Sequence, residues 1–276
     1  MSETDKVLYE VDKKVATITL NRPEALNALD MDVLDTLPKL FDEAEHDPKV
    51  HALVITGTGE KAFTAGLDTK MLSSATPESD IFNRVLVQGD KMASMLFHMK
   101  KPTAVAVNGL AMGWGMISAM MVDFRFAVDE PGVFFALSEL DAGVYPATAA
   151  AYGAVMNFGL KKAQEMLLTA KRYSVQEMQA QNFITAAIPR DQLLEETMKV
   201  MVKIARRPTY LVYMSKATMN MHAARIFDDA VAMEYEFFNY MKEKEHQDDA
   251  PIDEFLKQQW AKFERLPREG QPWGTE

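Results

Sequence analysis

The sequence contains no cysteine among its 276 residues. This absence excludes disulfide bonds, metal sites with thiolate ligands and catalysis by a thiol nucleophile. No apolar run approaches the ~20 residues that a membrane-spanning helix needs. The N-terminal residues Met1–Lys6 are polar and acidic, so they do not match the basic start of a secretory signal. We therefore expect a cytoplasmic protein that has no contact with a membrane.

The chain also lacks an excess of positive charge. Its 30 Lys and Arg residues against 40 Asp and Glu residues give a formal net charge of −10. This balance argues against nonspecific binding to nucleic acid, and we expect no such partner. Local lysines and helix N-termini can still bind an anionic ligand. The five histidines show no spacing typical of metal ligands, so we expect no metal site.

What the chain does contain is enough apolar residues, 48%, for a sizeable buried core. Strands are predicted at 15–20, 52–55, 103–107, 124–127 and 133–135. Helices are predicted at 29–46, 81–99, 161–168, 175–181, 192–205, 223–244 and 253–263, and one more follows Gly115. Pro38 implies a kink in the first of these helices. The early alternation of strands and helices predicts an α/β fold, which becomes mostly helical from about residue 160.

Two glycine-centred loops, each between an apolar strand and a helix, carry the strongest functional signal. They are Phe63–Lys70 (loop one) and Asn108–Gly115 (loop two). A tight glycine turn at a helix start leaves backbone N–H groups unpaired and directs the positive end of the helix dipole outward. Two such turns facing one spot predict an oxyanion hole made of backbone, suited to a thioester carbonyl that becomes an enolate.

Five motifs in a fixed order carry a resemblance to a known family. They are Asn21-Arg22-Pro23 with Ala25–Leu29, Phe63–Lys70, Ala106–Gly115, Met121–Asp123, and Phe135–Glu139 with Gly143. Over roughly residues 8–200 they resemble the crotonase superfamily, that is, the enoyl-CoA hydratase/isomerase family. The resemblance implies a spiral of ββα units over 1–195, a C-terminal helical region over 196–276, and a homotrimer or dimer of trimers. It implies acyl-CoA as the substrate and no further cofactor.

The same resemblance implies roles for individual positions. The backbone N–H groups of Leu67 and Trp114 would be the two oxyanion donors. Trp114 stands after Gly113, where the family usually has the middle glycine of three, so its indole must lie beside the acyl pocket. The positions implied to hold the adenine and pantetheine of CoA are Ala25, Leu26, Ala65, Gly66 and Asp68. Lys70 would contact a phosphate.

The acid and base positions depart from the family's hydratases, which use two glutamates. Ile117 stands at the first of these positions, and Glu139 at the second. Other members carry a carboxylate near Tyr145–Ala147, where this chain has none. Hydration needs a positioned water with both a proton acceptor and a proton donor, whereas moving a double bond needs one base. A single Glu139, with its pKa raised by apolar neighbours, therefore favours a Δ3-to-Δ2 enoyl-CoA isomerase.

Several alternatives remain open at this stage. A hydratase, hydrolase or carbon–carbon lyase of the same family would share the enolate, and a catalytically silent CoA-binding or assembly subunit is the alternative of another class. Asp141 would be a second acid if it alternates with Leu140 along a strand that contains Glu139. Tyr145 would be a proton donor or part of the pocket wall. Asp68 also fits a cap that orders loop one, and Asp123 fits a structural contact at a helix end.

Overall fold

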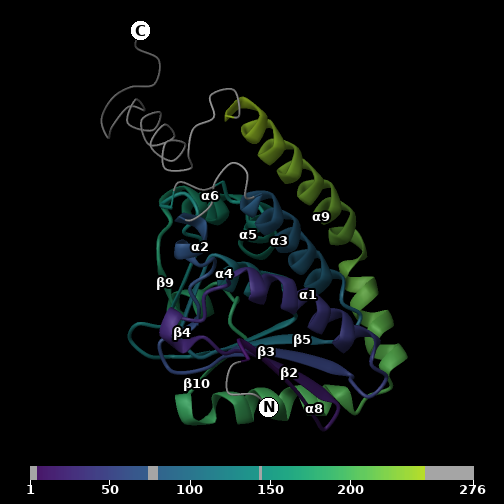
Figure 1. Cartoon of the computed structure of the whole chain (residues 1–276). Helices are drawn as coiled ribbons and strands as arrows, with labels where there is room; N and C mark the ends of the chain where they lie inside the picture. The colour runs from purple at the N-terminus through teal and green to yellow at the C-terminus, as the bar shows by residue number, and fades with distance from the viewer. Residues whose placement is uncertain (1–4, 74–79, 143–144, 246–276) are drawn as a thin grey trace.

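The computed structural model describes residues 5–73, 80–142 and 145–245, and it contains two β-sheets with helices around them (Figure 1). The larger sheet has the order β1 (Val7–Asp12), β2 (Val15–Leu20), β3 (Ala52–Gly57), β5 (Thr103–Val107), β7 (Phe124–Val128) and β10 (Ala186–Ile188). β1 pairs antiparallel with β2, and all other neighbours are parallel. β5 is buried along its whole length, as expected for a parallel strand covered on both faces.

Three strands of the smaller sheet each follow, in the chain, one of the strands β3, β5 and β7 of the larger sheet. Its order is β4 (Ala62–Thr64), β6 (Leu110–Met112), β8 (Phe134–Ala136) and β9 (Tyr173–Ser174). The chain thus passes from β3 to β4, from β5 to β6 and from β7 to β8. It returns to the larger sheet at β5, at β7 and, after β9 of the smaller sheet, at β10. This repeated path, with a helix after each pair, confirms the α/β fold and the spiral of ββα units.

The helices cover both faces of the larger sheet. They are α1 (Met31–His46), α2 (Thr69–Ser73), α3 (Ile81–His98), α4 (Trp114–Met121), α5 (Ala150–Phe158), α6 (Leu160–Thr169), α7 (Val175–Ala180), α8 (Leu193–Ala205) and α9 (Thr209–Glu245). Figure 1 shows α1 and α4 above the larger sheet and α8 below it. α8 packs against β2, β3, β5 and β7, so the proposed boundary at residue 195 falls inside a helix that belongs to the sheet's covering layer.

The long helix α9 is fixed to the sheet and to α3. The Lys216 ammonium donates to the Asp123 carboxylate at 2.7 Å, and the same carboxylate accepts the Thr103 backbone N–H at 2.8 Å. Further along α9, the ring of Phe227 stacks on Phe97 of α3 with 4.3 Å between centroids. Asp123 therefore has the structural role that its place at a helix end suggested.

Most predicted elements agree with the structure, and the differences have physical reasons. α1 runs unbroken through Pro38. The sequence reasoning missed β1, β4, β6, β9, β10, α2 and α5. It read most of β4 and the start of α2 as part of loop one, and β6 as part of loop two. Strands of two or three residues are too short to show a period, and they form because a neighbouring strand supplies hydrogen bonds. α9 begins at Thr209, not at 223 as predicted. The prediction missed its first turns because the apolar residues Tyr210, Leu211 and Met214 are exposed and break the apolar period. The predicted helix at 253–263 lies outside the described residues.

Candidate active site

Loop one is held in place by backbone hydrogen bonds to the residues before α1. The Leu29 N–H donates to the Gly66 carbonyl at 2.8 Å, and the Asp68 N–H donates to the Leu29 carbonyl at 3.0 Å. Gly66 has a φ of +85°, a conformation that favours glycine. The Leu67 N–H between these bonds has no acceptor among the described residues. It is thus available to a ligand.

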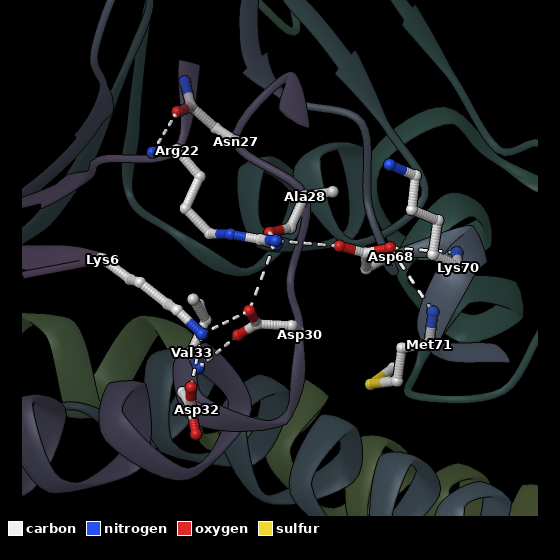
Figure 2. Close-up of polar contacts among 10 residues, drawn as sticks. All are labelled: Lys6, Arg22, Asn27, Ala28, Asp30, Asp32, Val33, Asp68, Lys70 and Met71. Carbon is white, nitrogen blue, oxygen red and sulfur yellow. Dashed lines mark hydrogen bonds and ion pairs between the residues drawn. The ribbon is translucent and has the colours of Figure 1, made fainter. Parts of the chain in front are cut away.

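An ion-pair network fixes the outer side of loop one (Figure 2). The Arg22 guanidinium lies 3.0 Å from the Asp68 carboxylate and 3.3 Å from Asp30. Asp68 also accepts the backbone N–H groups of Lys70 at 3.0 Å and Met71 at 3.4 Å, at the start of α2. Burial opposes the charged form, but these donors hold the pKa of Asp68 below its ordinary value. Asp68 is therefore the cap that orders loop one.

Loop two ends in a turn that starts α4. Gly113 has a φ of +50° and donates its N–H to the carbonyl of Ala136 on β8 at 3.1 Å. Trp114 is the first residue of α4, and its backbone N–H has no acceptor among the described residues. The Ile117 N–H closes the first helical turn on the Gly113 carbonyl at 2.9 Å. The free N–H of Trp114 therefore lies at the positive end of a buried helix.

The two loops face each other at close range. A Cβ built on Gly66 would lie 3.4 Å from the Trp114 backbone nitrogen and 3.1 Å from the Met112 carbonyl oxygen. A Cβ built on Gly113 would lie 3.5 Å from Oε1 of Glu139. The Leu67 and Trp114 N–H groups and the Glu139 carboxylate therefore border one small space.

Glu139 lies in a turn after β8, so the expectation that a strand carries Glu139 and Asp141 is wrong. The Ala142 N–H donates to the Ser138 carbonyl at 3.1 Å, which turns the chain instead of extending it. Oε2 of Glu139 is buried and has no hydrogen-bond partner in the described part of the chain. Burial raises the pKa of Glu139 to about 7. Both Glu139 and Asp141 line the same pocket, but Asp141 is exposed.

A pocket of about 400 Å³ opens at this point. Eight of the predicted site residues line it: Ala65, Gly66, Leu67, Gly113, Trp114, Ile117, Glu139 and Tyr145. Burial raises the pKa of the Tyr145 phenol, and the nearby Glu234 carboxyl raises it further. Ala25, Leu26, Asp68 and Lys70 do not line the pocket. Leu26 is 37% exposed and Lys70 is exposed, so these two side chains face solvent and not the pocket.

The Trp114 side chain occupies the pocket wall, as its bulk required. It is only 4% exposed, and its Nε1–H has no hydrogen-bond partner among the described residues. Trp114 thus offers a backbone donor and places its bulky indole in the wall beside that donor.

The sequence reasoning missed the apolar side of the pocket. It is formed by Leu34 of α1, Leu72 of α2, and Phe82, Val85, Leu86 and Met92 of α3. The helical period of α3 was visible, but a period does not distinguish a face that packs in the core from one that faces a cavity. Within 5–73, 80–142 and 145–245, no group of three His, Cys, Asp or Glu residues is placed to hold a metal ion. No helix of these ranges is long and apolar enough to span a bilayer.

Comparisons with known proteins place the whole chain beside one family. The family model described as enoyl-CoA hydratase/isomerase matches residues 10–265. The short-chain-enoyl-CoA hydratase of Clostridium acetobutylicum is 31% identical over 249 residues, which cover 90% of this chain and 94% of that protein. The mitochondrial enoyl-CoA hydratase of Pongo abelii is 34% identical over 206 residues, 75% of this chain and 69% of that protein. A solved enoyl-CoA hydratase/isomerase from Pseudoalteromonas atlantica has a TM-score of 0.77 at 21% identity and covers 96% of this chain and 99% of that one.

Proposed function

Because this chain belongs to the enoyl-CoA hydratase/isomerase family, we propose that it is a Δ3-to-Δ2 enoyl-CoA isomerase with Glu139 as its acid/base group. The observation that carries the proposal is the combination of a carboxyl group at Glu139 and an apolar side chain at Ile117. The Glu139 carboxyl borders the two free N–H groups, whereas Ile117, at the position of the hydratases' first glutamate, is apolar and 3% exposed. One carboxyl beside an oxyanion hole suits a reaction that moves one proton.

In this mechanism the thioester oxygen of a 3-enoyl-CoA lies between the N–H groups of Leu67 and Trp114. Glu139 removes a proton from C2, and the electron pair of that C–H bond delocalises to the carbonyl oxygen as a dienolate. The two N–H donors stabilise this negative charge where it develops. Glu139 then returns its proton to C4, which leaves the double bond between C2 and C3. Atoms and charge balance without a co-reactant.

The environment of Glu139 suits both halves of this reaction. A pKa of about 7 means that the carboxylate is available as a base near neutral pH and that the carboxylic acid is a competent donor afterwards. The buried Oε2 has no partner among the described residues that would hold the group in one charge state. Ile117 and the apolar wall of α3 leave little to hold a water molecule against the double bond.

The apolar wall also supports an unsubstituted acyl chain as the substrate's variable part. Leucine, valine, phenylalanine and methionine side chains from α1, α2 and α3 line that wall of the pocket. The CoA portion would extend out of the pocket along loop one. Ala25 and Leu26 would then contact the adenine and pantetheine, and Lys70 would contact a phosphate. We further propose that the chain assembles as a homotrimer or dimer of trimers, which light scattering with size-exclusion chromatography would test.

A hydratase is the second candidate, because the relatives reported above are named hydratases. Asp141 lines the pocket with Glu139 and is the described carboxylate best placed to serve a water molecule. The decisive experiment compares two substrates of equal chain length. Conversion of 3-hexenoyl-CoA to 2-hexenoyl-CoA should be much faster than hydration of 2-hexenoyl-CoA. Efficient hydration would overturn the isomerase proposal in favour of the hydratase, and no turnover of either at several chain lengths would favour a hydrolase, a lyase or a silent CoA-binding subunit.

A further inference from the structure

The side chain of Arg125 reaches the C-terminal end of α4, and it has no part in the mechanism above. Its Nη1 donates to the carbonyl oxygen of Ala119 in the last turn of α4 at 2.9 Å, and to that of Val122, the residue that ends the helix, at 2.6 Å. The last carbonyl groups of a helix have no partner inside the helix, so they need donors from elsewhere. Arg125 supplies two of these hydrogen bonds.

The same guanidinium fixes this helix end to the larger sheet. Nε donates to the Phe183 carbonyl at 2.7 Å, and Nη2 donates to the Asp123 carbonyl at 3.2 Å. The guanidinium carbon also lies 4.8 Å from the centroid of the Phe183 ring. Arg125 belongs to β7, and Phe183 comes shortly before β10, which pairs with β7. One side chain therefore joins α4 to β7 and to the segment that leads into β10.

The positive charge of Arg125 has no ion-pair partner of its own. In the described part of the chain, no carboxylate forms an ion pair with its guanidinium. The carboxylate whose charge acts on it is that of Asp123, which instead pairs with the Lys216 ammonium at 2.7 Å. Burial lowers the pKa of Arg125 to about 10, so the guanidinium keeps its charge at neutral pH. Because Asp123 and Lys216 offset each other, one net positive charge remains at this end of α4.

α4 connects this cation to the proposed oxyanion hole. All eight residues of the helix are buried, and a helix of that length spans about 12 Å. The Trp114 N–H at its start has no acceptor among the described residues. The backbone dipoles make that end of the helix positive and the Arg125 end negative, and the guanidinium offsets the negative partial charge. An anion beside Trp114 is therefore attracted by the near end of α4 and is not opposed by an uncompensated negative far end.

We propose that Arg125 is a positioning residue of the oxyanion hole: it fixes the far end of α4, so that the Trp114 N–H stays directed between the two loops, and its charge favours an anion at the helix start. This inference rests on the proposed function, because it concerns the same oxyanion hole. Arg125 does not line the pocket, so binding of a neutral acyl group should not depend on it. A unit charge about 12 Å away, at an effective dielectric constant of about 20, changes the equilibrium that forms an anion by about 10-fold.

The test compares two ligands of equal chain length and needs no turnover. Hexanoyl-CoA has a neutral acyl group, and its affinity is measured by calorimetry. 3-Oxohexanoyl-CoA can lose a proton from C2 and become an enolate, which has its own ultraviolet absorption band, so a spectroscopic titration gives the pKa of the bound ligand. All variants carry Glu139→Gln, which removes the titration of Glu139. The other titratable groups that line the pocket, Asp141, Tyr145 and Arg172, are the same in every variant and cancel in the comparison.

Arg125→Gln removes the charge and leaves a shorter amide donor. The pKa of the bound enolate ligand should rise by about 1 unit, while the affinity for hexanoyl-CoA stays close to that of the parent protein. Arg125→Lys keeps a positive charge but loses the planar fork of donors, so the rise should be less than about half as large. The lysine variant also serves if Arg125→Gln does not fold, because a rise of a full unit in Arg125→Lys would contradict the role of the charge.

The matched control is Asn157→Leu, which removes an uncharged donor to the Met120 carbonyl at the same end of α4, at 3.2 Å. It should lower the melting temperature and leave the pKa of the bound ligand unchanged. If Arg125→Gln also lowers only the melting temperature, Arg125 is merely structural and the inference fails, even where the wild type isomerises 3-hexenoyl-CoA. An equal rise in Asn157→Leu would overturn the inference as well. If the bound enolate responds as expected but 3-hexenoyl-CoA is not isomerised, the role of Arg125 is supported and only the proposed reaction fails.

Discussion

Gly113 and Glu139 lie against each other: a Cβ on the glycine would be 3.5 Å from Oε1 of the glutamate. The next residue after Gly113 supplies a backbone N–H that has no acceptor in the described chain. The carboxyl group proposed as the acid/base and the amide proposed to bind the oxyanion therefore share one wall. Glycine suits this position because its φ is +50°, whereas an added Cβ would meet Oε1 of Glu139 only at an ordinary van der Waals distance.

Replacing Glu139 with Gln should lower turnover of a 3-enoyl-CoA by ~10² or more, because the proton carrier is lost. Binding of a saturated acyl-CoA should be nearly unchanged at pH 6. The measurements are steady-state kinetics and calorimetry, with Asp141→Asn as the control that removes the exposed carboxylate of the same pocket. If turnover falls in Asp141→Asn and is retained in Glu139→Gln, the acid/base group is Asp141 and not Glu139.

Replacing Gly66 with Ala should impair both binding and turnover. The new methyl group would lie 3.1 Å from the Met112 carbonyl oxygen and 3.4 Å from the Trp114 nitrogen, beside the proposed oxyanion hole. Gly132→Ala is a matched control, since Gly132 has a similar φ of +92° but no atom within 4 Å of the added Cβ. Thermal melts should show backbone strain in both variants, and a loss of acyl-CoA affinity should appear in Gly66→Ala alone. Equal affinities would argue against an oxyanion hole here.

Trp114 should set the length of acyl chain that the pocket accepts. Trp114→Ala keeps the backbone N–H and opens space in the pocket wall, so the preferred chain length should increase. Trp114→Phe keeps most of the bulk and removes an indole N–H that has no partner among the described residues, so it should change stability little. Comparing kcat/KM across a series of chain lengths tests this. An unchanged preference in Trp114→Ala would place the acyl chain elsewhere in the pocket.

The Lys216–Asp123 pair should be important for the attachment of α9. The two side chains are 7% and 25% exposed, so Lys216→Met leaves a partly buried carboxylate without its cation. We expect a loss of about 3 kcal/mol in the free energy of unfolding, measured with urea. Lys199→Met removes an exposed lysine that pairs with Glu195 and Glu196, and it should have almost no effect. Similar losses of unfolding free energy in both variants would show that the buried pair stabilises the fold no more than the exposed one.

Stability should fall as the pH rises from about 4 to about 7. The pKa values of Asp90, Glu139 and Glu234 are raised to about 7, above the ordinary value near 4 that the unfolded chain has. In that window the folded state binds more protons than the unfolded state, so the free energy of unfolding decreases with pH. Asp30 and Asp68 have lowered pKa values, and their contribution is lost below about pH 4 instead.

The check is urea unfolding at several pH values between 5 and 8. The triple variant Asp90→Asn, Glu139→Gln, Glu234→Gln should have a flatter profile than the wild type. Asp35→Asn should keep the wild-type slope. Wild-type stability that increases between pH 5 and pH 8 would contradict the raised pKa values.

The sequence by itself determined the central strands, most helices and the two glycine loops. Their signals are local: a run of apolar residues in β3 and β5, a helical period in α3, and glycines where Gly66 and Gly113 need positive φ. It also predicted Glu139 as the acid/base group, since the resemblance assigns a role to that position. For the same reason it anticipated that Trp114 lines the pocket.

Only the tertiary structure decided which side chains face the space between these loops. Whether Val85 of α3 packs in the core or lines a cavity depends on what lies opposite it, and periodicity does not carry that information. The short strands β4 and β6 exist because each is paired with a neighbour from another turn of the spiral. Glu234 accepts the Ala149 N–H although the two residues stand 85 positions apart in the chain, because α9 packs against α3 and α5. Burial and long-range contact set the protonation of such groups, and the chain acquires both only when it folds.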